Sequence, residues 1–129
     1  MLLFSEAMHL CELDPSKMEK PSFFDVRHIL RVRFSAQIDK GRWFFPNYPA
    51  PGIGDQKQEA FRGYRHEVLD CLVDAYIKLN TLNYSDMSKN SEHRSAFEKI
   101  KRAFTSEIQK IIDPRSRDEE FKKLIESVK

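Results

Sequence analysis

Apolar residues recur at every third or fourth position over long stretches of this chain, the spacing that gives an α-helix one apolar face. The pattern predicts helices over residues 2–13, 56–82 and 91–112, and a last helix that starts near Ser116. Pro15 and Pro114 close the first and third of these, because the residue before a proline avoids helical dihedral angles. We therefore predict an all-α fold, a small helical bundle of four to five helices that forms a single domain over residues 1–129.

Polar residues and a glycine give further detail of the predicted helices. Asp55 is placed to cap the helix over 56–82. Gly63 lies inside that helix, where glycine costs about 1 kcal/mol relative to alanine, so we expect another segment to pack closely against it. Ser116 and Glu119 have the spacing of a capping box, which predicts the start of the last helix.

The segment from Ser22 to Lys40 fits two patterns equally well. As a helix it carries an apolar stripe, Ser22 and Asp25 resemble a capping box, and Gly41 stops it. As a strand, its apolar and polar residues alternate from position 30 to position 39. The signals at both ends favour the helix. The alternative is an α+β fold with a β-hairpin near residues 29–45 packed on three helices, and whether Trp43, Phe44 and Phe45 are core or surface also stays open.

The middle third of the chain is basic, although the whole chain is nearly neutral. There are 22 basic and 20 acidic residues in total, which gives a net charge of +2. Between Val26 and His66, however, eight basic residues face three acidic ones, which gives +5. Six of the eight are arginines, whose planar donor fork suits carboxylates and phosphates. Three prolines and two glycines within residues 46–54 predict an irregular loop next to them.

This basic and aromatic segment is the predicted contact surface. Its residues are Arg27, Arg31, Arg33, Arg42, Trp43, Tyr48, Arg62 and Arg65. Tryptophan, tyrosine and arginine are enriched at binding hot spots, so Trp43 and Tyr48 are expected to anchor a protein partner while the arginines orient its acidic surface. We therefore predict a non-enzymatic helical protein–protein interaction module, such as an adaptor, a chaperone-like protein or an assembly subunit.

Two other interpretations of the same residues stay open. A nucleic-acid-binding protein would use the arginines on phosphates and stack bases on the aromatic rings. A purely structural role would bury Trp43 and leave the arginines as a solvated face whose stems cover apolar surface.

The residue types that carry catalysis or metal binding form no recognisable motif. The four histidines lack the spacing of a helical metal site, and no serine lies in Gly-x-Ser-x-Gly. Gly52 and Gly54 lack the third glycine and the lysine of a phosphate-binding loop. We expect no catalytic residue, no metal and no cofactor, and the sequence favours a non-enzymatic role over an enzymatic one.

The cysteines and the hydropathy of the chain indicate the cellular compartment in which we expect the protein. Cys11 and Cys71 are isolated thiols in helical patterns, which indicates a reduced, buried pair. The N-terminus lacks the features of a signal peptide, and no apolar run approaches the roughly 20 residues that span a bilayer. We expect a cytoplasmic protein with no membrane partner, and the broad apolar faces of two helices leave a homo-oligomer open.

Overall fold

Helices make up most of the chain. The computed structural model describes residues 2–12, 19–84, 88–112 and 114–128. Its elements are α1 (Leu2–Glu12), α2 (Lys20–Phe44), the 3₁₀ turn η1 (Glu59–Phe61), α3 (Glu67–Asn80), α4 (Asn90–Ile112) and α5 (Pro114–Val128). Within these described ranges there is no β-strand, only an isolated antiparallel bridge between Tyr48 and Tyr64. The all-α prediction is confirmed, and the hairpin alternative for residues 29–45 is wrong.

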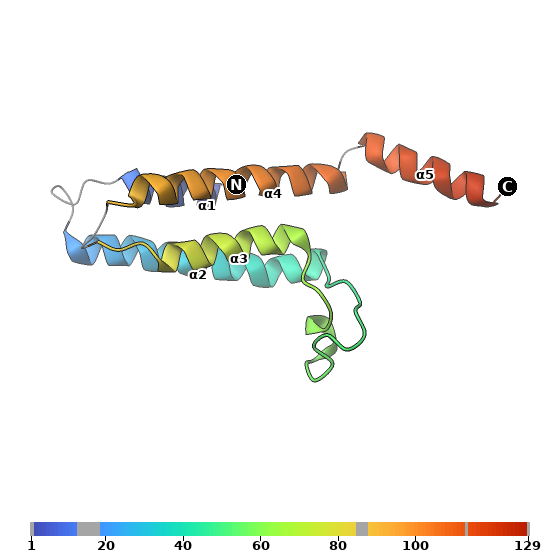
Figure 1. Ribbon diagram of the computed structural model, residues 1–129, viewed down its shortest axis with the longest axis horizontal. Coiled ribbons are helices and arrows are strands. Elements are labelled where there is room, and N and C mark those ends of the chain that lie inside the picture. Colours follow the sequence, from blue (N-terminus) through green and yellow to red (C-terminus); the bar gives the residue numbers. More distant parts are fainter. Residues whose placement is uncertain (1, 13–18, 85–87, 113, 129) are drawn as a thin grey trace.

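Four of the helices form a bundle of two layers. The α1 and α4 helices lie side by side in one layer, and α2 and α3 lie side by side in the other (Figure 1). Contacts of α3 with α4 and of α1 with α2 join the two layers. The α5 helix extends beyond the bundle from the end of α4 (Figure 1). No helix in the described parts of the chain has both the length and the apolar character needed to cross a membrane.

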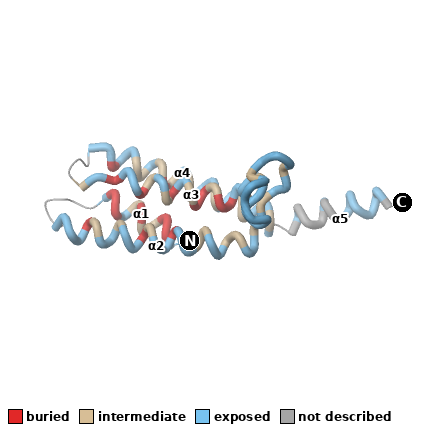
Figure 2. Tube along the Cα trace, turned by 90° about the horizontal axis from the view of Figure 1, so that it is seen from below, coloured by how far each residue is buried: buried red, intermediate tan, exposed pale blue. Residues whose placement is uncertain are grey.

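Phenylalanine rings fill the space between the layers. Phe4 from α1 meets Phe34 of α2 edge-on at 5.5 Å between ring centroids and also contacts Phe104 of α4 at 5.4 Å. Phe97 of α4 and Leu69 of α3 are fully buried in the same cluster. Figure 2 shows the buried residues on the inward faces of these helices. The apolar stripes recognised in the sequence therefore meet in one core.

The α2 helix starts earlier and ends later than predicted. It begins at Lys20, with Pro21 in its first turn, and no side chain caps it, so the capping box from Ser22 and Asp25 is wrong. Gly41 lies inside the helix instead of stopping it. A Cβ atom built on Gly41 would collide with the side chain of Leu69, so this glycine lets α2 and α3 approach closely.

The predicted helix over residues 56–82 is wrong in its first half, because α3 begins only at Glu67. Its cap is His66, whose Nδ1 accepts a hydrogen bond from the Val68 N–H at 3.1 Å. Asp55 caps a turn instead, because its carboxylate accepts from the Gly52 N–H at 3.1 Å. Gly63 has a φ of +79°, which no α-helix accommodates.

The ends of the other helices agree with the sequence to different degrees. The α4 helix over Asn90–Ile112 confirms the prediction for residues 91–112. The α5 helix begins at Pro114, before Ser116, so the capping box predicted from Ser116 and Glu119 does not mark its start. Pro15 lies outside the described residues.

Two phenylalanines of α2 give a matched test of this core. Phe34 is 0% exposed and Phe44 is 72% exposed. We expect Phe34→Ala to lower the free energy of unfolding by about 3–5 kcal/mol, because it removes a fully buried ring and leaves a cavity. Phe44→Ala should change that free energy by less than about 0.5 kcal/mol. Urea denaturation followed by circular dichroism measures both, and equal effects would contradict the packing described here.

Candidate functional site: the end of α2 and the 45–66 loop

The chain leaves the bundle between α2 and α3 and folds into a separate loop, here called the 45–66 loop (Figure 1). Two backbone hydrogen bonds between Tyr48 and Tyr64, of 2.7 and 3.0 Å, tie its two ends together. The Gly63 N–H donates to the Ile53 carbonyl at 2.9 Å and adds a third tie. These bonds give the loop a defined shape whose one helical element is η1, and its irregular residues 46–54 agree with the loop that the prolines and glycines predict.

Aromatic side chains fasten the base of this loop to the start of α3. The Tyr48 ring stacks on His66 at 5.3 Å between centroids, and Phe45 contacts the same imidazole at 5.1 Å. The Tyr48 hydroxyl donates to the Glu67 carboxylate at 2.8 Å, which raises the pKa of the phenol. The pKa of Glu67 is lowered, first by a hydrogen bond from its own backbone N–H and then by Tyr48. Tyr48 thus contributes to holding the loop on the bundle.

Three of the predicted arginines contact the bundle itself. Arg27 donates from Nη1 to the Leu82 carbonyl at 2.8 Å, and its guanidinium lies 4.7 Å from the centre of the Phe24 ring. Arg31 lies over the Tyr76 ring at 5.7 Å. Arg33 forms an ion pair with Glu6 of α1 at 2.9 Å. Arg31 and Arg33 therefore link α2 to α3 and α1, and Arg27 links α2 to the segment after α3.

The other three arginines gather near the loop. Arg65 pairs through Nε with the Asp70 carboxylate at 2.6 Å, and Arg62 donates from Nε to the Lys57 carbonyl at 2.8 Å. The Arg42 guanidinium lies 4.8 Å from the centre of the Phe61 ring. At 1.5 Å per residue, Arg42 lies about 22 Å along α2 from Arg27. The predicted surface therefore divides into one group of arginines on the bundle and a second group near the loop.

Trp43 and Phe44 are surface residues. Trp43 is 80% exposed and Phe44 is 72% exposed, whereas Phe45 is partly buried against the core. They lie in the last turn of α2, next to the point where the chain turns into the 45–66 loop. The sequence left open whether the three aromatics belong to the core, and the structure buries only the third.

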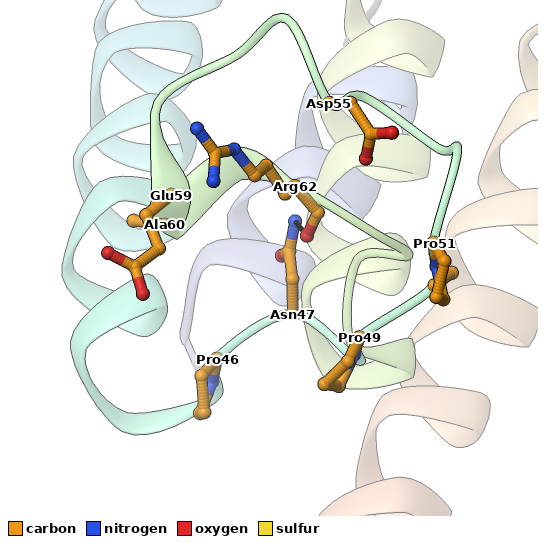
Figure 3. Close-up of a pocket in the computed structure, with 9 residues that line it drawn as sticks. Pro46, Asn47, Pro49, Pro51, Asp55, Glu59, Ala60 and Arg62 are labelled. Atoms are coloured by element: carbon orange, nitrogen blue, oxygen red, sulfur yellow. Dashed lines mark hydrogen bonds between the residues drawn. The ribbon is translucent and has the colours of Figure 1, made fainter.

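Two hollows lie against the loop. The first has a volume of about 420 Å³, and Figure 3 shows its walls, with Pro46, Pro49 and Pro51 from the outgoing part of the loop. Asp55 and Glu59 also line it, so its charges include carboxylates. The second, here called the basic hollow, has a volume of about 530 Å³. Its lining includes Arg42, Asn47, Lys57, Gln58, Phe61 and Arg65.

The sequence missed Lys57, Gln58 and Phe61 as surface residues because it placed all three in a helix. The signal against that helix was Gly63, which lies inside the predicted range and follows Gly52 and Gly54 closely, and all three adopt positive φ angles. Three glycines within twelve residues indicate a turning chain more strongly than the apolar spacing after Asp55 indicates a helix.

The described residues also include two thiols and side chains of the types that bind metal ions. Among the described residues, no group of histidine, cysteine and carboxylate side chains could hold a metal ion. Cys11 and Cys71 are free and buried, as predicted. Burial raises the pKa of Cys11 to about 11 and also raises the pKa of Cys71, which suppresses both thiolates.

The two thiols are therefore expected to be inert in the folded protein. With a pKa of about 11, only about one Cys11 in a thousand carries a thiolate at pH 8. We predict that Ellman's reagent at pH 8 reacts with both cysteines within minutes in urea and far more slowly in buffer. Rapid labelling of the native protein would contradict the burial of these two thiols.

Gly63 and Gly52 provide a matched test of the loop. Both have positive φ, but a Cβ atom on Gly63 would collide with the Tyr48 carbonyl, whereas one on Gly52 meets nothing within 4 Å. We expect Gly63→Ala to open the bridge, so that the Tyr48 and Tyr64 amides exchange with deuterium at least about tenfold faster. Gly52→Ala should lower the stability only by the strain of alanine at a positive φ, about 1–2 kcal/mol, and leave those two amides protected. Similar exchange in both variants would argue against the close approach.

Comparisons with known proteins give no counterpart for this bundle and loop. No protein-family model matches the chain, and no curated protein and no solved structure shows significant similarity to it. What this surface binds must therefore be inferred from its own side chains.

Proposed function

We propose that this protein is a non-enzymatic protein–protein interaction module and that its contact surface is the end of α2 together with the 45–66 loop. The observation that carries the proposal is Trp43, the only tryptophan, which is 80% exposed beside the equally uncovered ring of Phe44. Large aromatic side chains supply much of the binding energy at protein interfaces, because they bury a large apolar area at low entropic cost.

Cations at the end of α2 and in the loop support an acidic partner. Arg42 and Lys57 have no ion-pair partner in the part of the chain that the structure describes. Unpaired cations beside an apolar anchor attract a complementary negative surface and orient it during encounter. Arg27 and Arg33 are already engaged within the bundle, so the proposed surface is centred on Arg42 and Trp43.

Nucleic-acid binding is the second candidate, supported by the same combination of Arg42, Lys57 and an exposed indole on which a base can stack. The two functions separate by salt dependence. Phosphate contacts weaken steeply between about 50 and 200 mM salt because bound counterions are released. Fluorescence anisotropy with labelled single- and double-stranded oligonucleotides at these two concentrations distinguishes them.

A photo-crosslinking experiment tests the proposed contact surface. Benzoylphenylalanine is placed at position 43 in the full chain, and at position 77 as the control, because Ile77 is 55% exposed on α3. We expect a discrete crosslinked protein from position 43 that is not formed from position 77. The partner identified by mass spectrometry should then bind Trp43→Ala at least about 30-fold more weakly, as expected for a hot spot of about 2 kcal/mol.

Two outcomes would contradict the proposal. The same crosslinks from positions 43 and 77 would indicate non-specific collisions. Unchanged affinity of the identified partner for Trp43→Ala, with the circular dichroism of the variant unaltered, would exclude Trp43 as the anchor.

A further inference from the structure

The basic hollow, lined by Arg42, Lys57, Gln58, Phe61 and Arg65 among others, has an unusual balance of charge. Three cations line it, and no acidic side chain is among its described lining residues. The neighbouring hollow of about 420 Å³ differs, because Asp55 and Glu59 lie there with Arg62. The two hollows share Asn47, so the same loop presents one mixed and one wholly positive cavity.

Two of the three cations are uncompensated. Arg65 is paired with Asp70, which takes up its charge from outside the hollow. Arg42 and Lys57 make no ion pair within the described chain, and the Arg42 guanidinium lies against the Phe61 ring. The hollow therefore carries an unbalanced charge of two units. A dianion neutralises this charge, whereas a single carboxylate leaves half of it.

The fold of the loop fixes the backbone positions from which these cations extend. The Lys57 backbone is held on both sides, since its N–H donates to the Gly54 carbonyl at 2.9 Å and its own carbonyl accepts from Arg62 at 2.8 Å. Arg42 projects from the last turn of α2 onto Phe61, whose N–H donates to the Gln58 carbonyl at 2.9 Å. The Arg42 guanidinium is thus held against the Phe61 ring before a ligand binds, which lowers the conformational entropy that this donor loses on binding.

We propose that the basic hollow binds the dianionic phosphate group of a small organic phosphate monoester. The Arg42 guanidinium offers a fork of donors suited to phosphate oxygens, and the Lys57 ammonium supplies a second positive charge. The Gln58 amide, which has no recorded partner in the described chain, adds a neutral donor. The volume of about 530 Å³ lies within the range of small-molecule sites, so it has room for an organic group beside the phosphate.

This site shares Arg42 and Lys57 with the proposed protein-binding surface, but it does not include Trp43, the proposed protein anchor. Loss of phosphate binding in Arg42→Gln or Lys57→Gln therefore tests the hollow, whereas loss of partner binding in Trp43→Ala tests the anchor. The two proposals can therefore fail separately.

Nuclear magnetic resonance titration of the ¹⁵N-labelled full chain tests the site. The ligands are O-phosphoserine, inorganic phosphate, serine and acetate, at constant ionic strength. We expect O-phosphoserine to shift the amides of residues 57–65 and of Arg42 saturably, with a Kd on the order of 1 mM or tighter. Inorganic phosphate should shift the same amides more weakly, because it lacks the organic part, and serine and acetate should not saturate.

Charge-matched variants separate the site from general attraction to a basic protein. Arg42→Gln and Lys57→Gln, measured singly, should each weaken O-phosphoserine binding by about tenfold. Lys99→Gln removes the same charge from an exposed position of α4 and should leave binding unchanged. Shifts spread over all basic surfaces, or equal binding to the three variants, would overturn the proposal. Saturable binding of serine would also overturn it. The amide shifts of the wild-type protein test the site even if one variant fails to fold.

Discussion

The contact of phenylalanine rings between the two helix layers is the interaction on which the rest of this structure depends. Phe4 touches Phe34 of α2 and Phe104 of α4, so one ring of the shortest bundle helix joins three helices. Because these rings carry no polar atom, they pack without any hydrogen bond to satisfy. They set the spacing between the layers, and within one layer Gly41 lets α2 approach Leu69 of α3.

The close packing of α2 and α3 also fixes where the chain leaves the bundle. Their adjacent ends are joined by the 45–66 loop, whose ends must lie close together and therefore pair through Tyr48 and Tyr64. That pairing requires a glycine at position 63, since a side chain there would strike the Tyr48 carbonyl. The shape of the loop is thus a consequence of the helix packing and of a few glycines, and the surface formed by Arg42, Lys57 and Phe61 depends on both.

The arginines of the basic segment have different roles, although they look alike in the sequence. Those in the body of α2 are used inside the bundle, where Arg33 pairs with Glu6 and Arg27 binds a carbonyl beyond the end of α3. Arg42, one turn from the loop, retains an uncompensated charge beside exposed Trp43. The exposed indole keeps a large apolar area in contact with water, which is unfavourable, whereas the two cations are stabilised by hydration in the free protein.

The sequence by itself determined the fold class and most of the core. The three-four apolar spacing marks buried faces such as Phe97 on α4, because helical periodicity is a local property. Only the tertiary structure decided that residues 56–66 are loop, that Gly41 lies inside a helix, and that Trp43 is exposed while Phe45 is partly buried. It also decided which arginines are already paired, since Glu6 and Asp70 come close to Arg33 and Arg65 only in the folded chain. These features depend on which distant segments meet, and residue spacing along one segment carries no information about that.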